Sequence, residues 1–295
     1  MTRIGYAGPE HSLPERLLIE AIEMLSGRAW LQALYDWTTD RVDEGEPFFS
    51  CSLEALGIPQ PWSEHDLARV PRDGPVVFVA NHPFGVIDGL VLCDLAERTR
   101  GSFQVMLHTA LCREERLRDV LLPVDFGGTE EARRTNIRST RSALRLLARG
   151  GALVVFPSGG IATRGCGLRG LADLPWNPFP ARVVRKARAT VVPVWFGGSN
   201  SALFHAASYV GQVPRLAMIF NEVRNKHGQP LTVRVGEPLV WSELQRAADA
   251  VTLTRRLREA VFALADERSR QEDRTTVVPR WLLDGSPDRM VKLRS

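Results

Sequence analysis

The chain has 295 residues, of which 44% are hydrophobic, and a formal net charge of +4 at pH 7. This length and composition allow one large buried core, so they favour one sizeable domain with appended segments over two independent domains. No apolar run approaches the roughly 18 residues that span a bilayer, and no hydrophobic signal segment follows the first residues. We therefore expect neither a membrane-spanning helix nor a secretory signal.

The cysteine and arginine content indicates where the protein is located and what kind of partner it binds. The four cysteines lie far apart and form no C-x-x-C pair, which disfavours a zinc site and a disulfide framework and favours a reducing cytoplasm. Only three of the 38 basic residues are lysines. Because arginine matches the geometry of phosphate and carboxylate groups, we expect a phosphorylated ligand or an anionic membrane surface as a partner. The modest net charge does not indicate nucleic acid.

The N-terminal part of the chain is predicted to be helical and then connecting. Ser12 and Glu15 have the spacing of a capping box and begin an amphipathic helix over 12–25, and a second helix is predicted over 29–37. The first helix has an acidic polar face, which is a poor match for anionic lipid, so we expect both helices to pack on the core. Residues 44–75 are rich in Pro, Gly and acidic side chains and are expected to form a connector.

Buried strands are predicted from there onwards, because short apolar runs rich in β-branched residues are bounded by turn residues. These runs cover residues 76–80, 103–106, 123–126, 152–156 and 191–196. Residues 231–235 alternate between apolar and polar side chains, as an edge strand does.

Helices are predicted between the strands, over 88–98 and over 129–149, with Thr129 as the cap of the second one. A long capped helix is predicted over 242–268. This alternation predicts an α/β fold in which helices flank a mostly parallel central sheet, preceded by an N-terminal helical segment. We divide the chain into residues 1–74 (helical segment and connector), 75–240 (core) and 241–295 (C-terminal helix and tail).

Polar residues follow the first predicted strand where it ends, in Asn81-His82-Pro83-Phe84-Gly85 and then Asp88-Gly89. The carboxyl ends of parallel strands are where ligands bind in open α/β sheets. A histidine there, with an aspartate near the start of the next helix, supplies a general base and its orienting carboxylate. In the alternative, Asn81 and His82 satisfy backbone groups in a turn and Asp88 caps the helix.

The strand over 152–156 ends in the same way, in Pro157-Ser158-Gly159-Gly160. Together the two turns resemble the signatures of the glycerolipid, or lysophospholipid, acyltransferases. That family carries Asn-His…Asp at one strand end and Phe-Pro-x-Gly at a later one. The matching pieces here are Asn81-His82…Asp88, Phe156-Pro157-Ser158-Gly159 and Val192-Pro193-Val194, in the family's order, and the similarity covers about residues 75–240.

The resemblance implies transfer of a fatty acyl chain from a thioester, acyl-carrier protein or coenzyme A, to a lipid hydroxyl in membrane lipid biosynthesis, without a resident cofactor. It implies that His82 takes the hydroxyl proton as the oxygen attacks the thioester, and that Asp88 orients the imidazole. Lysophosphatidic acid or an aminoacyl lysolipid such as lyso-ornithine lipid is the implied acceptor. Residues expected to bind substrate are Asn81, Phe84, Gly85, Phe156, Pro157, Ser158, Gly159, Gly160, Arg138 and Arg141.

Two departures from the family pattern set expectations for the structure. Five residues lie between His82 and Asp88, one more than in the common signature, so the turn at Pro83-Phe84-Gly85 has to absorb the extra residue. Ser158 stands where the family usually has a glutamate.

A stripe of arginines follows Thr129 on its predicted helix. Arg134, Arg138, Arg141 and Arg145 recur at spacings of four, three and four and therefore line one face. Such a stripe is usually a solvated helix side. Because the helix lies between the two strands that carry the motifs, its amino end should open near the site, and we predict that Arg138 and Arg141 meet an acidic carrier protein or an anionic bilayer. The enzyme would then be cytoplasmic and peripherally associated with the inner membrane.

Two other functions compete with this prediction. Ser158, His82 and Asp88 are the residue types of a hydrolase triad, but the G-x-S-x-G of a nucleophile elbow is absent, because Phe156 stands two residues before Ser158. A non-catalytic lipid-binding protein would keep the fold without needing His82. The paired glycines match no nucleotide-binding pattern and are expected to form tight turns.

Overall fold

The structure, a computed structural model, describes Leu13, Leu17 and residues 27–112, 114–165, 170–211, 214–215, 218–275, 277–279 and 290–292. The helix predicted over 12–25 lies outside the described residues, except for Leu13 and Leu17.

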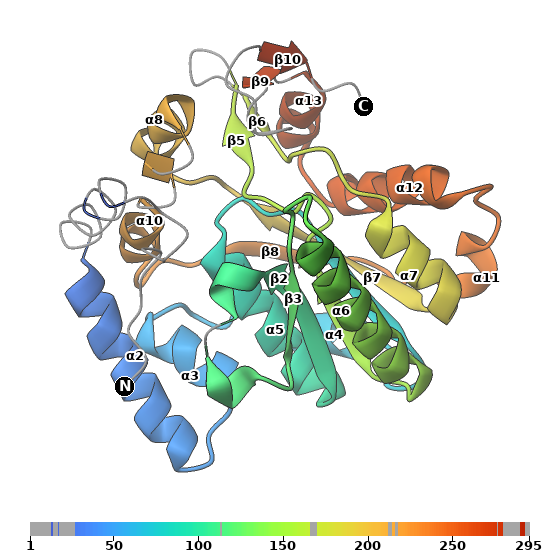
Figure 1. Ribbon diagram of the computed structural model, residues 1–295, viewed down its shortest axis with the longest axis horizontal. Coiled ribbons are helices and arrows are strands. Elements are labelled where there is room, and N and C mark those ends of the chain that lie inside the picture. The colour runs from blue at the N-terminus through green and yellow to red at the C-terminus, as the bar shows by residue number, and fades with distance from the viewer. Residues whose placement is uncertain are drawn as a thin grey trace.

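A six-stranded sheet with the strand order β3-β2-β4-β1-β7-β8 organises the fold (Figure 1). Its strands are β1 (Val76–Ala80), β2 (Phe103–His108), β3 (Leu121–Val124), β4 (Ala152–Val155), β7 (Thr190–Gly197) and β8 (Thr232–Val235). The first five pair in parallel, and β8 pairs antiparallel with β7 at the edge. The predicted mostly parallel α/β sheet and its edge strand are therefore confirmed.

Helices cover both faces of the sheet because alternate side chains of each strand point to opposite sides. In β1, Val76, Phe78 and Ala80 join the core beneath one set of helices, and Val77 and Val79 join the other core. The first core includes side chains of α2 (Arg28–Asp43), α3 (Phe48–Ala55) and α5 (Val86–Arg100). The second includes side chains of α6 (Glu130–Ala148), α7 (Phe179–Ala187) and α12 (Ala250–Ala263). Figure 1 shows these two layers.

Local signals fix where several helices begin. The Thr129 hydroxyl accepts a hydrogen bond from the Ala132 amide (3.1 Å) at the start of α6, as predicted. The helix predicted over 29–37 is the first part of α2, and its Trp30, Leu31 and Leu34 pack against the core. The predicted core packing is confirmed for these three residues, whereas Trp37, expected on the same side, is 39% exposed.

The predicted connector over 44–75 is wrong, since it contains α3 and α4 (Glu64–Arg69). Phe49 and Leu53 lie one helical turn apart and are buried in the first core, where α3 packs against α5. The proline and glycine residues mark helix ends: Pro47 is the N-cap residue of α3, and Gly57 follows the helix. These residues interrupt the helical spacing of apolar residues in the sequence, but two short helices still form between them.

The single helix predicted over 242–268 is also wrong. Three helices occupy this stretch and its extension: α11 (Trp241–Leu244), α12 and α13 (Glu267–Thr275). The breaks come at aspartates, whose side chains prefer to cap a helix rather than sit inside it. The Asp249 carboxylate accepts a hydrogen bond from the Thr252 amide (2.7 Å), and the Asp266 carboxylate accepts one from the Ser269 amide (2.8 Å).

Shorter elements lie at the carboxyl edge of the sheet and beyond it. They are β5 (Thr163–Arg164), β6 (Leu171–Ala172), α8 (Ala202–Val210), α10 (Ile219–Asn225), β9 (Val277–Pro279) and β10 (Met290–Lys292). Strands β5 and β6 pair antiparallel, as do β9 and β10.

Candidate active site

The carboxyl end of β1 is joined firmly to the neighbouring strand β7. The Asn81 side chain donates a hydrogen bond to the Phe196 carbonyl (2.9 Å) and accepts one from the Phe196 amide (2.8 Å). Both polar groups of this buried amide are therefore engaged by one backbone residue. Asn81 therefore links the ends of β1 and β7, immediately before His82.

His82 and Asp88 meet despite the extra residue between them. His82 Nδ1 lies 3.1 Å from Asp88 Oδ2, an ion-pair distance, although the ring N–H is not aligned with the oxygen as in an ideal hydrogen bond. The Asp88 side chain is fully buried, whereas 17% of the His82 side chain is exposed. Asp88 is therefore sealed behind an imidazole that solvent and substrate can reach.

The turn from His82 to α5 absorbs the extra residue through Gly85. Gly85 has a φ of 84°, which favours glycine, and a Cβ there would come within 2.7 Å of Ile161. The turn aims the Phe84 and Gly85 amides at Asp88 Oδ2, at 2.8 and 3.0 Å. Asp88 thus holds the start of the helix and also faces the imidazole, so the two alternatives for its role are combined.

Burial raises the pKa of Asp88, and the contacts with His82 and with the two amides of the turn oppose that rise. Its second oxygen, Oδ1, is buried and has no hydrogen-bond partner among the described residues. A charged Asp88 therefore depends on its contacts through Oδ2. The same oxygen, Oδ2, faces His82 Nδ1.

The second predicted motif lies directly against the imidazole. The Phe156 ring stacks on His82, with ring centroids 4.2 Å apart, and limits how the imidazole can rotate. Gly159 has a φ of 64°, and a Cβ there would lie 3.1 Å from Phe126. Pro157 contributes its carbonyl, which accepts a hydrogen bond from the Asn177 amide (2.8 Å). The structure therefore brings Phe156 of the second motif against His82 of the first.

Ser158 serves the turn itself. Its hydroxyl donates a hydrogen bond to the Gly160 carbonyl (3.0 Å), and among the described residues it makes no hydrogen bond to His82. The nucleophile–base contact of a serine hydrolase is thus not formed in this geometry.

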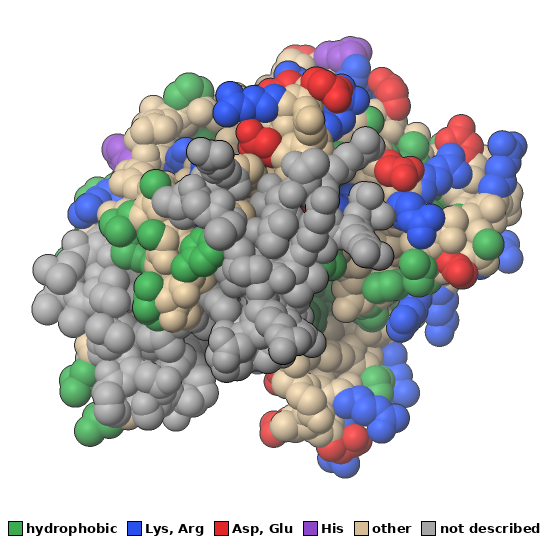
Figure 2. Space-filling model, turned by 90° about the horizontal axis from the view of Figure 1, so that it is seen from above, with side chains coloured by type: hydrophobic (Ala, Val, Ile, Leu, Met, Phe, Trp, Pro, Cys, Tyr) green, Lys and Arg blue, Asp and Glu red, His purple; other side chains and the backbone are tan. Residues whose placement is uncertain are grey.

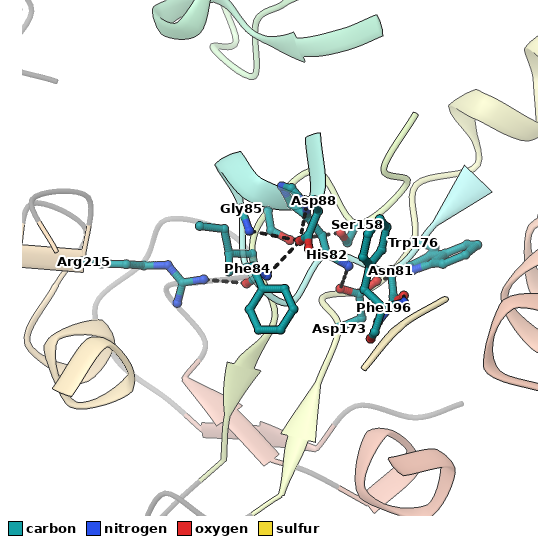
Figure 3. Close-up of polar contacts among 12 residues, drawn as sticks. Asn81, His82, Phe84, Gly85, Asp88, Ser158, Asp173, Trp176, Phe196 and Arg215 are labelled. Carbon is teal, nitrogen blue, oxygen red and sulfur yellow. Dashed lines mark hydrogen bonds and ion pairs between the residues drawn. The ribbon is translucent and has the colours of Figure 1, made fainter. Parts of the chain in front are cut away.

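A second buried aspartate, which sequence reasoning missed, contacts the backbone of His82. Asp173 follows β6, and its Oδ1 accepts a hydrogen bond from the His82 amide at 3.2 Å (Figure 3). Its Oδ2 accepts one from Trp176 Nε1 at 2.6 Å. On the other side of the residue, the His82 carbonyl accepts a hydrogen bond from the Ala162 amide (2.7 Å). The His82 backbone is therefore fixed at both ends of its peptide.

Asp173 is in turn tied to the C-terminal helices. Its amide donates a hydrogen bond to Asp273 Oδ1 on α13 (2.9 Å), and Asp273 Oδ2 pairs with the Arg258 guanidinium on α12. Burial raises the pKa of Asp173 to about 7, with Trp176 opposing the rise and Asp273 adding to it. Nothing in the sequence around Asp173 resembles a motif, because this chain of contacts links positions about a hundred residues apart.

Comparison with known proteins places this geometry in a family. The acyltransferase family model matches residues 45–267. The chain belongs to the acyltransferase family. Two curated relatives are lyso-glycine lipid O-acyltransferases, one from Bacteroides thetaiotaomicron (24% identical, covering 74% of this chain and 76% of the relative). The other is from Phocaeicola vulgatus (23% identical, covering 67% of this chain and 71% of the relative).

The arginine stripe of this acyltransferase lies on α6, beside the edge strand β3. Arg138, Arg141 and Arg145 line a groove of about 480 Å³, together with residues of β3 such as Leu122 and Pro123. Arg134 differs from the other three, because it pairs with Glu130 at 3.5 Å. The groove is therefore basic along most of its helical wall.

Two properties of the described residues bear on metals and membranes. Within the part of the chain that the structure describes, no three His, Cys, Asp or Glu side chains come together as a metal site would require. None of the helices in the same part is both long and apolar enough to cross a membrane.

Proposed function

We propose that this acyltransferase moves a fatty acyl chain from an acyl thioester, acyl-carrier protein or coenzyme A, to the hydroxyl of a lysolipid. The single observation that carries the proposal is the contact of His82 Nδ1 with the buried Asp88, at the strand end where the two family motifs meet. The names of the two relatives support a lysolipid acceptor with an amino-acid group. Lysophosphatidic acid is the other acceptor that we propose. We propose no resident cofactor.

In this mechanism His82 is the general base. Because Nδ1 faces Asp88, Nε2 is the nitrogen that remains for the acceptor. Nε2 takes the hydroxyl proton as the acceptor oxygen attacks the thioester carbonyl, and the C–S bond then breaks. The departing thiolate takes the proton from the imidazolium, which restores neutral His82. A positioned base of this kind accelerates a reaction typically by ~10²–10⁴-fold.

The surface supports contact with a lipid phase and with an anionic partner. Leu203 and Val210 on α8 are 61% and 78% exposed. Seen from above in Figure 2, hydrophobic side chains gather toward the side where α8 lies, and Lys and Arg gather toward α7 and α12. We propose that the enzyme works from the cytoplasm, bound peripherally to the inner membrane, and that Arg138 and Arg141 meet the acidic carrier protein or anionic lipid.

The test uses purified protein with radiolabelled acyl-carrier protein and acyl-coenzyme A. Lyso-glycine lipid, lyso-ornithine lipid and lysophosphatidic acid serve as acceptors, and the products are separated by chromatography. We expect label in the diacyl product of at least one acceptor. Release of free fatty acid without acceptor turnover would favour a hydrolase, and binding of lipid without either product would favour a non-catalytic protein.

A further inference from the structure

Arg215 is an arginine buried beside the His82 loop, and its partners among the described residues are all neutral. It is 6% exposed, and its guanidinium donates hydrogen bonds to the Ser208 hydroxyl (2.8 Å), the Thr163 hydroxyl (3.4 Å) and the Ile161 carbonyl. A guanidinium has five N–H donors. Three hydrogen bonds therefore leave two donors without a partner among the described residues.

No carboxylate compensates this buried charge in the part of the chain that the structure describes. Burial alone lowers the pKa of Arg215 to about 10, and no acidic group counteracts it. The Phe204 ring lies against the guanidinium face, 4.9 Å from its centroid, which leaves the edges of the fork for ligands. A buried charge is costly unless it is paired, so this site is suited to receive an anion.

Neighbouring residues add polar but uncharged groups to the same region. Asn200 is 3% exposed, and neither polar atom of its side chain has a partner among the described residues. His205, which contacts the Asn200 backbone, has its pKa lowered to about 3 by burial and by the charges of Arg164 and Arg215. The imidazole is therefore neutral, and it adds no charge that would repel or attract an anion.

This polar cluster adjoins the residues that hold His82. The Ile161 carbonyl is bonded to Arg215, and the Ile161 side chain packs on Gly85 of the catalytic turn. The next residue, Ala162, donates its amide to the His82 carbonyl. In Figure 3 the Arg215 guanidinium points toward the loop that carries Phe84 and Gly85.

We propose that Arg215 and Asn200 form the subsite for the anionic head group of the lysolipid acceptor. This inference rests on the proposed function, since it assigns the acceptor of that same site. A carboxylate or a phosphate matches the two unused N–H groups of the guanidinium, because both present paired oxygens. The Asn200 amide supplies one more donor. An anion held here would place the rest of the acceptor next to the His82 loop.

The test measures binding, so it does not depend on turnover. Dissociation constants are determined by calorimetry for a short-chain lyso-glycine lipid, its neutral methyl ester and a short-chain lysophosphatidic acid. For the wild type we expect tighter binding of the two anions than of the ester. Arg215→Met should weaken binding of the two anions by roughly 10- to 100-fold and leave binding of the ester nearly unchanged, because a charge-assisted hydrogen bond is lost.

Two variants separate recognition from folding. Asn200→Ala removes side-chain groups that bond to no described residue, so the variant should fold normally. Its affinity for the anions should fall selectively. Ser208→Ala removes one hydrogen bond to Arg215 but keeps the charge, and it should largely preserve the preference for anions. If Arg215→Met weakens binding of the carboxylate ligand more, the site holds a carboxylate head group. If it weakens binding of the phosphate ligand more, the site holds a phosphate.

Equal affinity of the wild type for the acid and its ester would overturn the inference. So would equal losses for the anions and the ester in Arg215→Met and Asn200→Ala, which would show a structural role only. Failure of the proposed function appears elsewhere, as a wild type that binds the anionic lysolipids selectively but acylates none of them.

Discussion

Two buried carboxylates contact His82, and they reach it by different routes. Asp88 comes from the turn that follows His82 and faces the imidazole, at 3.1 Å from Nδ1. Asp173 comes from a segment 91 residues further along and contacts the backbone amide of His82, at 3.2 Å. Asp88 contacts the imidazole, which is the general base of the proposed mechanism, whereas Asp173 contacts the backbone and holds the position of the loop. Burial raises the pKa of both.

His82 is therefore held by a local contact and by a remote one. The local support is complete within the residues from His82 to Asp88 and needs only the turn geometry of Gly85. The remote support needs β6, α12 and α13 to be in place. Variants that remove each carboxylate separately should therefore differ in size and in kind.

Of the two carboxylate variants, Asp88→Asn is expected to have the larger effect. The amide keeps the volume but loses the charge that stabilises the imidazolium, so kcat should fall by about 100-fold. The acceptor KM should change little, because Asp88 is sealed from substrate. Near-normal kcat in a folded Asp88→Asn protein would show that Asp88 only caps α5.

A smaller effect, roughly 10-fold in kcat, is expected for Asp173→Asn, because a shifted catalytic loop lowers the rate without changing the base. The two donors approach different oxygens of Asp173, and asparagine has an NH2 group in place of one of them, so one of the two hydrogen bonds is lost. Trp176→Phe is the matched control, since it removes only the indole donor and should cost less. Loss of thermal stability with unchanged kcat would make Asp173 a purely structural residue.

Asp173→Asn should also change how stability depends on pH. With its pKa raised to about 7 in the folded protein, Asp173 binds more protons when folded than when unfolded. The free energy of unfolding of the wild type should therefore fall as pH rises through roughly 4 to 7, and the variant should lack this part of the fall. Denaturant titrations at several pH values measure the difference.

The local support was predictable from sequence because its parts are contiguous. A valine-rich strand followed by Asn81-His82 and Asp88, and the Thr129 cap of α6, are patterns that chain neighbours complete. Asp173 and Arg215 were not predictable, because their partners come from distant segments. The same reason explains α3: its burial depends on α5, while the prolines and glycines around it resemble a connector.

The groove along α6 is lined by neither Asp88 nor Asp173. Charge reversal with Arg138→Glu and Arg141→Glu should raise the KM for acyl-carrier protein several-fold and leave kcat nearly unchanged. Wild-type binding should weaken as salt rises, because exposed charges are screened. Arg134→Glu is the control, since Arg134 already pairs with Glu130. If the double variant binds carrier protein and liposomes as tightly as the wild type does, the arginines have no ligand role and form an ordinary solvated helix face.

The smallest effect is expected for Ser158→Ala. Among the residues that the structure describes, its hydroxyl bonds only the Gly160 carbonyl within its own turn, so acyl transfer should fall by no more than a few-fold, as for loss of one neutral hydrogen bond. Mass spectrometry of the wild type incubated with donor alone should find no acyl-serine. A trapped acyl-Ser158, with complete loss in Ser158→Ala, would restore the hydrolase interpretation.

The most direct test of the central proposal is acyl transfer to lysolipid by His82→Ala. Initial rates are compared with those of the wild type under saturating donor and acceptor, with circular dichroism and melting to confirm the fold. We predict a loss of roughly 10²–10⁴-fold, the contribution of a positioned general base. A folded His82→Ala protein that transfers acyl chains at close to the wild-type rate would contradict the mechanism.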